Sequence, residues 1–145
     1  YTWAERPLWT VGIESDAHQR TPVPIAAHPE GCHYRVRMIE GLDQIGKPWR
    51  ITFSSPGING LQQAVQSGFG VTALTQRTLA RGMRVLTEKD GFPPLADIHV
   101  GMFFKNTGAS TAALLLVNYI MQALKDSGQT DFLRLERPGN VAVVA

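Results

Sequence analysis

Residues 49–74 read WRITFSSPGINGLQQAVQSGFGVTAL, and the spacing of their apolar residues changes twice along the stretch. The alternation over residues 49–54 predicts a strand. Ser55 stands where it could cap a helix that ends at Gly68, and residues 70–75 predict a second strand. The expected buried face of this helix consists of Leu61, Ala64 and Val65. Strand, helix and strand with short connections predict an α/β domain with a largely parallel sheet.

The preceding sequence continues the same alternation. Residues 8–13 and 23–27 read as strands, and Pro24 belongs at the start or edge of its strand because it lacks an N–H. A helix is expected from Cys32 to Gly46, since its apolar residues recur every three or four positions. The stripe consists of Tyr34, Met38, Leu42 and Ile45, broadened by Val36 and Ile39.

The following sequence adds two strands and one long helix. Residues 83–87 predict an edge strand, and residues 97–104 predict the last strand. Ser110 can cap a helix over residues 111–125. This helix has little polar face, so we expect it either to be buried or to drive self-association. Its apolar residues are Leu114, Leu115, Leu116, Val117, Tyr119, Ile120, Met121 and Leu124.

Composition narrows the class of protein. The chain has 145 residues, of which 43% are hydrophobic and 18% charged, as is typical of one globular domain. A net charge of +2 excludes a strongly basic nucleic-acid binder. A single cysteine, Cys32, excludes an intrachain disulfide and a four-cysteine zinc site. The longest apolar run, residues 112–117, is too short for a transmembrane helix.

Two strand-to-helix junctions, residues 27–32 and 54–58, are the candidate binding sites. In open α/β sheets, ligands bind outside the carboxyl ends of the strands. Each junction also opens a helix, whose free N–H groups and dipole favour a carboxylate or phosphate. The hydroxyls of Ser54 and Ser55 could add hydrogen-bond donors, and Gly31 leaves room for close approach.

Other features of these junctions do not decide which chemical class of ligand binds, or whether one binds. Glu30 would repel an anion unless its side chain pointed aside, and together with His28 it could select an amine or a neutral polar molecule. The same Pro, Gly and Ser residues also serve as ordinary helix caps in proteins without a ligand there.

The residues predict neither a metal site nor a catalytic site. His28, Cys32 and His33 lack an evident fourth ligand for zinc. Cys32 lacks a resolving cysteine, which favours a small buried core residue over a redox sensor. There is no G-x-S-x-G nucleophile elbow and no other catalytic cluster. We therefore expect no enzyme activity, no metal and no cofactor.

Three segments in order carry a resemblance to a known family. They are residues 29–35 (PEGCHYR), residues 49–55 (WRITFSS) and residues 64–74 (AVQSGFGVTAL). Together they resemble the effector-binding domain of LysR-type transcriptional regulators over roughly residues 5–124. The resemblance implies a fold like that of type 2 periplasmic binding proteins, in which two α/β subdomains enclose a small effector in a cleft.

The resemblance also implies how the chain is divided. The second subdomain would be complete, with only the returning strand and helix of the first. The implied segments are a crossover at residues 1–11, effector-binding subdomain II at 12–98, the returning strand and helix of subdomain I at 99–127, and a C-terminal tail at 128–145. Because the chain starts at Tyr1, we expect a fragment, with a winged helix-turn-helix and a linker helix encoded upstream.

The implied function is that of the effector-sensing part of a cytoplasmic, dimeric DNA-binding regulator. A small molecule, for which a carboxylate is one candidate, would bind in the cleft and alter transcription, while DNA would be contacted only through the absent N-terminal domain. The implied lining is His28, Pro29, Glu30, Gly31, Ser54, Ser55, Gly70, Val71 and Thr72. The alternatives are a solute-binding protein of the type 2 periplasmic family and a stand-alone interaction module.

Overall fold

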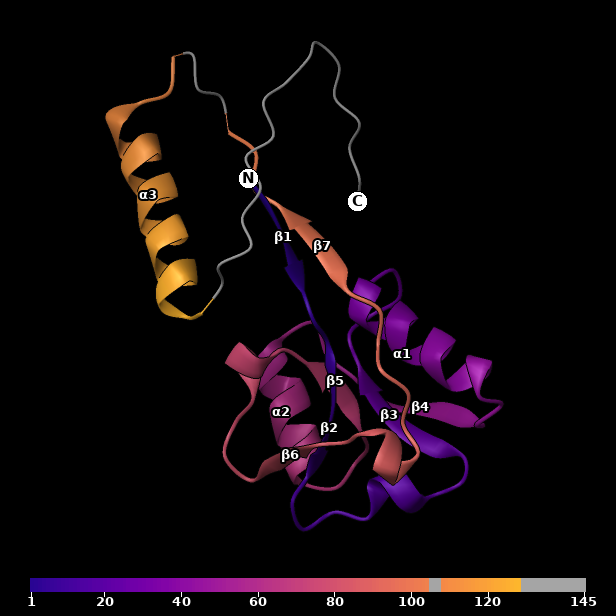
Figure 1. The fold of residues 1–145 in the computed structure, drawn as a ribbon. Helices are drawn as coiled ribbons and strands as arrows, with labels where there is room; N and C mark the ends of the chain where they lie inside the picture. The colour runs from indigo at the N-terminus through magenta and orange to yellow at the C-terminus, as the bar shows by residue number, and fades with distance from the viewer. Residues whose placement is uncertain (105–107, 129–145) are drawn as a thin grey trace. The chain divides into compact units, whose positions relative to one another are not determined.

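The computed structural model describes residues 1–104 and 108–128, and the chain divides into two compact units (Figure 1). One unit is Glu5–Ile98, and the other comprises Tyr1–Ala4 and the chain from His99 onward. Within the described part, no helix has both the length and the apolar character needed to cross a membrane. The predicted tail beyond residue 128 lies outside the described residues.

The Glu5–Ile98 unit is built on five short strands. They are β2 (Leu8–Gly12), β3 (Val23–Ala27), β4 (Trp49–Ser54), β5 (Thr72–Leu74) and β6 (Met83–Val85). Strand β3 pairs in parallel with β4, and a parallel bridge between Ile25 and Val71 links β3 to the residue preceding β5. Strand β2 lies between β5 and β6 and is antiparallel to both.

The prediction of a largely parallel sheet is therefore wrong for half of the strand pairs. Helical crossovers connect β3 to β4 and β4 to β5, and such crossovers produce parallel strands. Strand β2 comes before these strands in the sequence. It lies between β5 and β6 and runs antiparallel to both. Its apolar sequence predicted a strand but contained no information on its direction.

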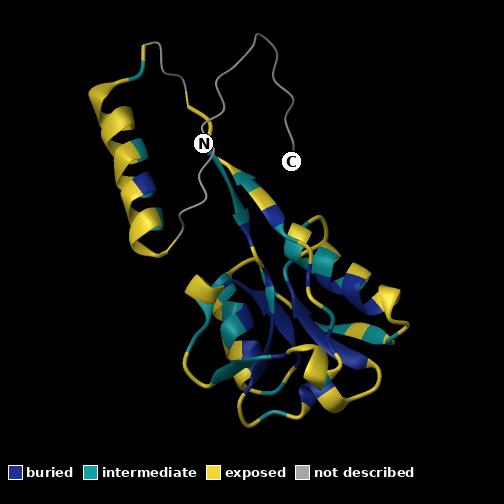
Figure 2. Cartoon of the chain, viewed as in Figure 1, coloured by how far each residue is buried: buried dark blue, intermediate teal, exposed yellow. Residues whose placement is uncertain are grey.

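Helices α1 (His33–Gln44) and α2 (Ile58–Gln66) cover opposite faces of the sheet, and the buried residues lie between the layers (Figures 1 and 2). Neighbouring residues of β3 point to different faces, as alternation requires: Ile25 and Ala27 pack with α1, while Ala26 packs with α2. The predicted α2 face is confirmed, because Leu61, Ala64 and Val65 are all buried.

The predicted apolar stripe of α1 is only partly buried. Met38 and Leu42 are in the core, whereas Ile45 is 49% exposed and Val36 is 38% exposed. The prediction that Ile45 belongs to the buried stripe is wrong, because the helix ends at Gln44 and Ile45 is its C-cap. Strand β4 matches its predicted bounds, and Pro24 is the second residue of β3, near its start as expected.

Three short 3-10 helices complete this unit, with bounds Ala17–Gln19 (η1), Gln76–Thr78 (η2) and Glu88–Asp90 (η3). After η3, the chain runs back across the α1 side of the sheet. Phe92 and Leu95 of this segment are buried, and the Phe92 ring lies edge-on to Trp9 with centroids 5.1 Å apart. The segment therefore belongs to the core although it has no regular structure.

The second unit contains all but one residue of each of two paired strands, β1 (Thr2–Glu5) and β7 (Ile98–Gly101), together with helix α3 (Thr111–Asp126); Glu5 and Ile98 belong to the first unit. Strand β7 is shorter than predicted, whereas α3 agrees with the prediction to one residue at its end. The Ser110 hydroxyl caps α3 by accepting the Ala113 N–H at 3.2 Å, as expected. Of its residues only Met121 is buried, and Leu115 and Tyr119 are 64% and 73% exposed.

Candidate functional site

Parallel pairing of β3 and β4 brings the two predicted junctions together. Ala27, the last residue of β3, is in register with Ser54, the last residue of β4. The next residue, Ser55, continues the contact, because its N–H donates to the Ala27 carbonyl at 3.1 Å. His28 and Ser55 thus start the two connections at one edge of the sheet, where each connection leads into a helix.

The first junction is held by a basic side chain that the site prediction did not include. The Arg35 guanidinium donates to the His28 carbonyl at 3.4 Å and lies 3.7 Å from the Glu30 carboxylate. The Arg35 side chain is only 17% exposed, whereas that of Glu30 is 92% exposed. Glu30 thus reaches into solvent. The sequence could have indicated Arg35, because it stands in the first turn of α1.

Aromatic contacts add to this junction. The His28 ring lies edge-on to the Tyr34 ring, with centroids 6.3 Å apart. Burial raises the pKa of the Tyr34 hydroxyl above its usual value, and the nearby Cys32 thiol adds to the effect. Tyr34 is therefore a neutral hydroxyl at physiological pH and can serve as a hydrogen-bond donor beside His28.

At the second junction, Ser55 does not cap α2. Its hydroxyl accepts the Gly57 N–H at 3.2 Å and lies 3.1 Å from the Gly57 carbonyl, so it stabilises the turn, and Gly57 itself is the N-cap. The prediction of a Ser55 cap is wrong by two residues. Ser54 is exposed, and a Cβ at Gly57 or Gly31 would meet no atom within 4 Å. Both junctions therefore have open space at the helix start.

The last three predicted residues lie elsewhere. Gly70, Val71 and Thr72 are buried at the amino end of β5, where Val71 bridges to Ile25. A Cβ at Gly70 would come within 2.7 Å of the Pro24 carbonyl oxygen. The structure thus does not bring these residues to the edge formed by the ends of β3 and β4. It places Thr75 at the carboxyl end of β5 instead.

The residues that could bind a metal and the single thiol are arranged as follows at the junctions. In the described ranges, no three His, Cys, Asp or Glu side chains are grouped so that they could hold a metal ion. Cys32 is the N-cap of α1 and is half-buried with a free thiol. The prediction of a buried core cysteine is wrong, because Cys32 precedes the helix and belongs to neither core cluster.

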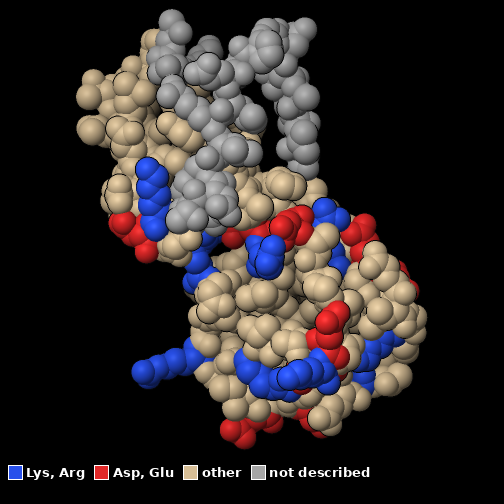
Figure 3. Space-filling view, in the orientation of Figure 1, with Lys and Arg blue, Asp and Glu red and all other residues tan. Residues whose placement is uncertain are grey.

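Charged side chains of both signs are interspersed on the face of the molecule that Figure 3 shows. Six arginines of the described residues are neutralised by a nearby carboxylate: Arg6 by Asp97, Arg20 by Asp16, Arg35 by Glu30, Arg37 by Glu40, Arg77 by Glu5 and Arg84 by Asp90. On this face the described residues form no continuous basic surface of the kind that binds a phosphate backbone.

We compared the chain with known protein families, sequences and structures. No protein-family model matches the chain. The HTH-type transcriptional regulator PecT of Dickeya dadantii is 26% identical over 90 residues, which cover 62% of this chain. The matched region is 28% of the length of PecT.

Two solved regulatory domains have a similar fold. The CcmR regulatory domain of Synechocystis PCC6803, solved in complex with 2-PG, superposes with a TM-score of 0.53 and 16% identity, covering 86% of this chain and 65% of that domain. The bromide-bound regulatory domain of HypT from Salmonella typhimurium superposes with a TM-score of 0.61 and 16% identity, covering 86% and 63%. Full-length HypT is described as a hypochlorite-specific LysR-type transcriptional regulator.

These comparisons confirm the resemblance to the effector-binding domain of LysR-type regulators. The chain has the mixed α/β fold of such regulatory domains and spans less than two thirds of their length. The proteins it resembles are transcriptional regulators, not enzymes. Two of the similar domains were solved with a small molecule or ion, 2-PG in one and bromide in the other.

Proposed function

We propose that this chain is the effector-sensing part of a LysR-type transcriptional regulator. A small molecule binds at the edge formed by the carboxyl ends of β3 and β4, and its binding alters transcription through a DNA-binding domain outside this sequence. The observation that carries the proposal is the pairing of Ala27 with Ser54, which sets two strand-to-helix junctions side by side. Such an edge is where open α/β sheets bind ligands.

The local chemistry favours a small carboxylate or related anion as effector. The first turn of α1 offers unpaired N–H groups, and the Arg35 guanidinium lies beside the same turn. The contrary charge, Glu30, is almost fully exposed and can move away from a bound anion. His28, Pro29, Gly31, Ser54 and Ser55 line this edge in the proposed site. Gly70, Val71 and Thr72 support it only from the core.

The proposed division follows the resemblance. Residues 12–98 form the complete second subdomain, β7 and α3 are the returning strand and helix of the first, and the remaining parts of the first subdomain are encoded elsewhere. The protein would then act in the cytoplasm, where a transcription regulator meets DNA. The reported regulators support this division because the chain spans 63% to 65% of their regulatory domains.

Self-association through α3 is part of the proposal. Leu115, Leu116 and Tyr119 are each more than half exposed on one helix. A contiguous apolar surface of this kind favours contact with a second apolar surface, and a second copy of the chain offers the same helix. Light scattering at rising protein concentration should show a mass above that of a monomer, and a constant monomeric mass would contradict this part.

A titration followed by two-dimensional NMR tests the effector site. Propionate, inorganic phosphate and propylamine are added separately to the full chain. We expect the two anions to shift the amide resonances of residues 28–35 and 54–58, with little response to the amine. Arg35→Gln should weaken anion binding several-fold, whereas Arg50→Gln, which removes an exposed arginine of β4, should not. An equal loss in both variants would indicate net charge rather than a site.

The gene sequence upstream of Tyr1 separates the regulator from the alternative solute-binding protein. A winged helix-turn-helix followed by a linker helix supports the regulator. An export signal followed by a first binding lobe would instead support a periplasmic solute-binding protein, and the proposal of DNA binding would be abandoned.

A further inference from the structure

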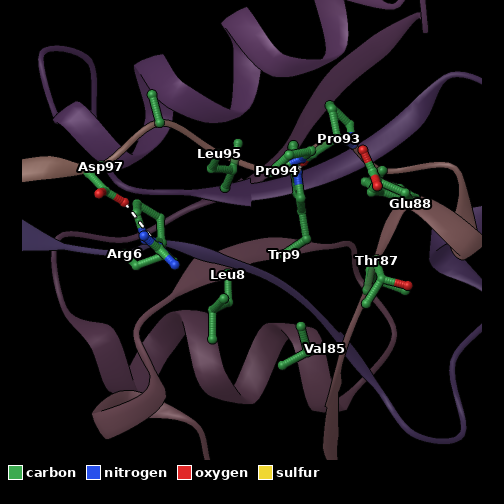
Figure 4. Close-up of a pocket in the computed structure, with 14 residues that line it drawn as sticks. Arg6, Leu8, Trp9, Val85, Thr87, Glu88, Pro93, Pro94, Leu95 and Asp97 are labelled. Atoms are coloured by element: carbon green, nitrogen blue, oxygen red, sulfur yellow. Dashed lines mark hydrogen bonds and ion pairs between the residues drawn. The ribbon is translucent and has the colours of Figure 1, made fainter. Parts of the chain in front are cut away.

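A hollow of about 530 Å³ lies within the Glu5–Ile98 unit, and none of its lining residues belongs to the β3–β4 edge (Figure 4). It is bounded by the first residues of β2, the end of β6 and the segment that follows η3. Its apolar walls are formed by Pro7, Leu8, Trp9, Val85, Pro93 and Leu95. This volume falls within the range of about 300–1,000 Å³ that is usual for small-molecule sites.

The hollow exists because one side of β2 is only partly covered. Strand β2 pairs with β5 from Leu8 onward, but with β6 only from Thr10 onward. On the N-terminal side of Thr10, one hydrogen bond, from the Leu86 N–H to the Trp9 carbonyl at 2.8 Å, continues the contact. The β6 side of Leu8 thus opens into the hollow rather than onto a strand.

Fixed interactions hold the opposite wall in place. The Trp9 indole N–H donates to the Pro93 carbonyl at 2.9 Å, which orients the ring and the proline segment together. At one end, Arg6 pairs with Asp97 at 3.2 Å. Leu95 is 8% exposed and packs toward Gly41 of α1, where a Cβ would meet it at 3.2 Å. A ligand would therefore enter a preformed site, which lowers the entropic cost of binding.

The charges around the hollow indicate the ligand's chemistry. Three charged residues line it, and two of them, Arg6 and Asp97, neutralise each other. The third, Glu88, stands at the other end and is exposed, so the lining carries one net negative charge (Figure 4). Trp9 is only 2% exposed and forms the floor of the hollow, whereas Leu8, Pro93 and Pro94 are partly or fully exposed and offer the apolar surface on which an aromatic ring can pack.

The geometry points to a second small-molecule site here, one that takes an arylalkylamine. The aromatic ring lies between Leu8 and the proline segment, over the buried Trp9, and the ammonium group reaches Glu88. This site is independent of the effector edge, because His28 and Ser54 contribute nothing to its lining. It is also independent of the proposed regulatory function, and its test does not require DNA.

Three probes of equal length test the proposal: 3-phenylpropylamine, 3-phenylpropan-1-ol and 3-phenylpropionate. Each is titrated into the full chain while the Trp9 indole N–H resonance is followed by NMR. We expect the amine to bind about threefold to fivefold more tightly than the alcohol, as suits one ion pair at a rim, and the carboxylate to bind most weakly. Shifts should centre on Trp9, Leu86 and Leu95.

Two variants and one control make the result decisive. Glu88→Gln should reduce the affinity for the amine to that for the alcohol, while Glu40→Gln, on an exposed position of α1, should leave the preference unchanged. Ala96→Trp, at an exposed lining position, should fill the hollow and abolish binding of all three probes. The proposal is overturned if no probe binds at millimolar concentration, if the amine has no advantage, or if Ala96→Trp binds as the parent does.

Discussion

Helix α2 and helix α3 carry similar apolar side chains but differ in what faces them. In α2, Leu61 and Val65 are completely buried against the sheet. In α3, Leu115 and Leu116 are 64% and 59% exposed, and only Met121 is buried. Apolar sequence alone thus does not determine burial. A helix is stabilised by burial only where a second layer covers its apolar face.

The same contrast separates the two units of the chain. All the buried apolar residues of the two core clusters lie in Glu5–Ile98, where a sheet has a helix on each face. The described part of the other unit has two paired strands and one helix. We therefore expect Glu5–Ile98 to account for the cooperative unfolding of the protein.

Truncating one leucine in each helix should give the largest difference. Leu61→Ala removes a fully buried side chain and should lower the free energy of unfolding by about 2–5 kcal/mol. Leu115→Ala removes an exposed side chain and should change it by less than about 0.5 kcal/mol. Urea denaturation of both variants, measured at low protein concentration, makes the comparison. Similar losses in the two variants would show that α3 is covered in solution.

A glycine pair provides the next largest effect and tests the two ends of the sheet. Gly70→Ala would place a Cβ 2.7 Å from the Pro24 carbonyl oxygen, so the backbone must move, at a cost of about 1–3 kcal/mol. Gly57→Ala meets no atom within 4 Å at a negative φ, so its stability should stay close to that of the parent. Thermal unfolding distinguishes them, and an unchanged Gly70→Ala variant would mean that β3 and β5 are not in close contact.

These glycines also show what the sequence could and could not predict. The alternation of strands and helices, the buried face of α2 and the Ser110 cap were predicted because they depend on local periodicity and capping chemistry. The direction of β2 was not, because its pairing partners, β5 and β6, lie about 60 and 70 residues further along the chain. Tertiary pairing of this kind has no local signal.

The sequence could indicate that two of the junctions are neighbours, because a helical crossover joins the strands that precede them. The residues that follow β3 and β4 are adjacent because the strands are parallel and in register. Gly70 stands at the beginning of its strand rather than at the end, and at Gly70 the close approach is to Pro24 rather than to a ligand. A glycine motif alone cannot distinguish these two uses. Arg35 was missed because its contact with His28 spans the turn between strand and helix.

The stability of the Glu5–Ile98 unit should depend on pH through His18. His18 is 8% exposed, and its Nε2 lies 3.2 Å from the Arg84 guanidinium. Burial, and then the charge of Arg84, lower the pKa of His18 below its usual 6.5. The unfolded chain therefore binds a proton at higher pH than the folded protein does. Stability should be greatest above pH 6.5 and fall as the pH drops below it, by at most about 1.4 kcal/mol per pH unit.

Replacing the imidazole tests this assignment. The Arg84 N–H donates to Nε2, so the proton of the neutral ring is on Nδ1, which is buried without a partner in the described structure. His18→Gln keeps an acceptor for Arg84 but cannot titrate. Urea unfolding at a series of pH values between 7 and about 5 should show a smaller slope in this variant. A slope equal to that of the parent would assign the effect to other groups.

The ion pair between Arg6 and Asp97 should have the smallest effect. Arg6 comes shortly before β2 and Asp97 directly precedes β7, so the pair lies close to both ends of the Glu5–Ile98 unit. The Arg6 side chain is 77% exposed, so solvent screens the pair, and Arg6→Gln should cost about 0.2–1 kcal/mol at low salt. The difference should shrink in 1 M NaCl, where the Debye length is about 3 Å. A loss as large as that of Leu61→Ala, and insensitive to salt, would show that the boundary between the units is as important for stability as the core.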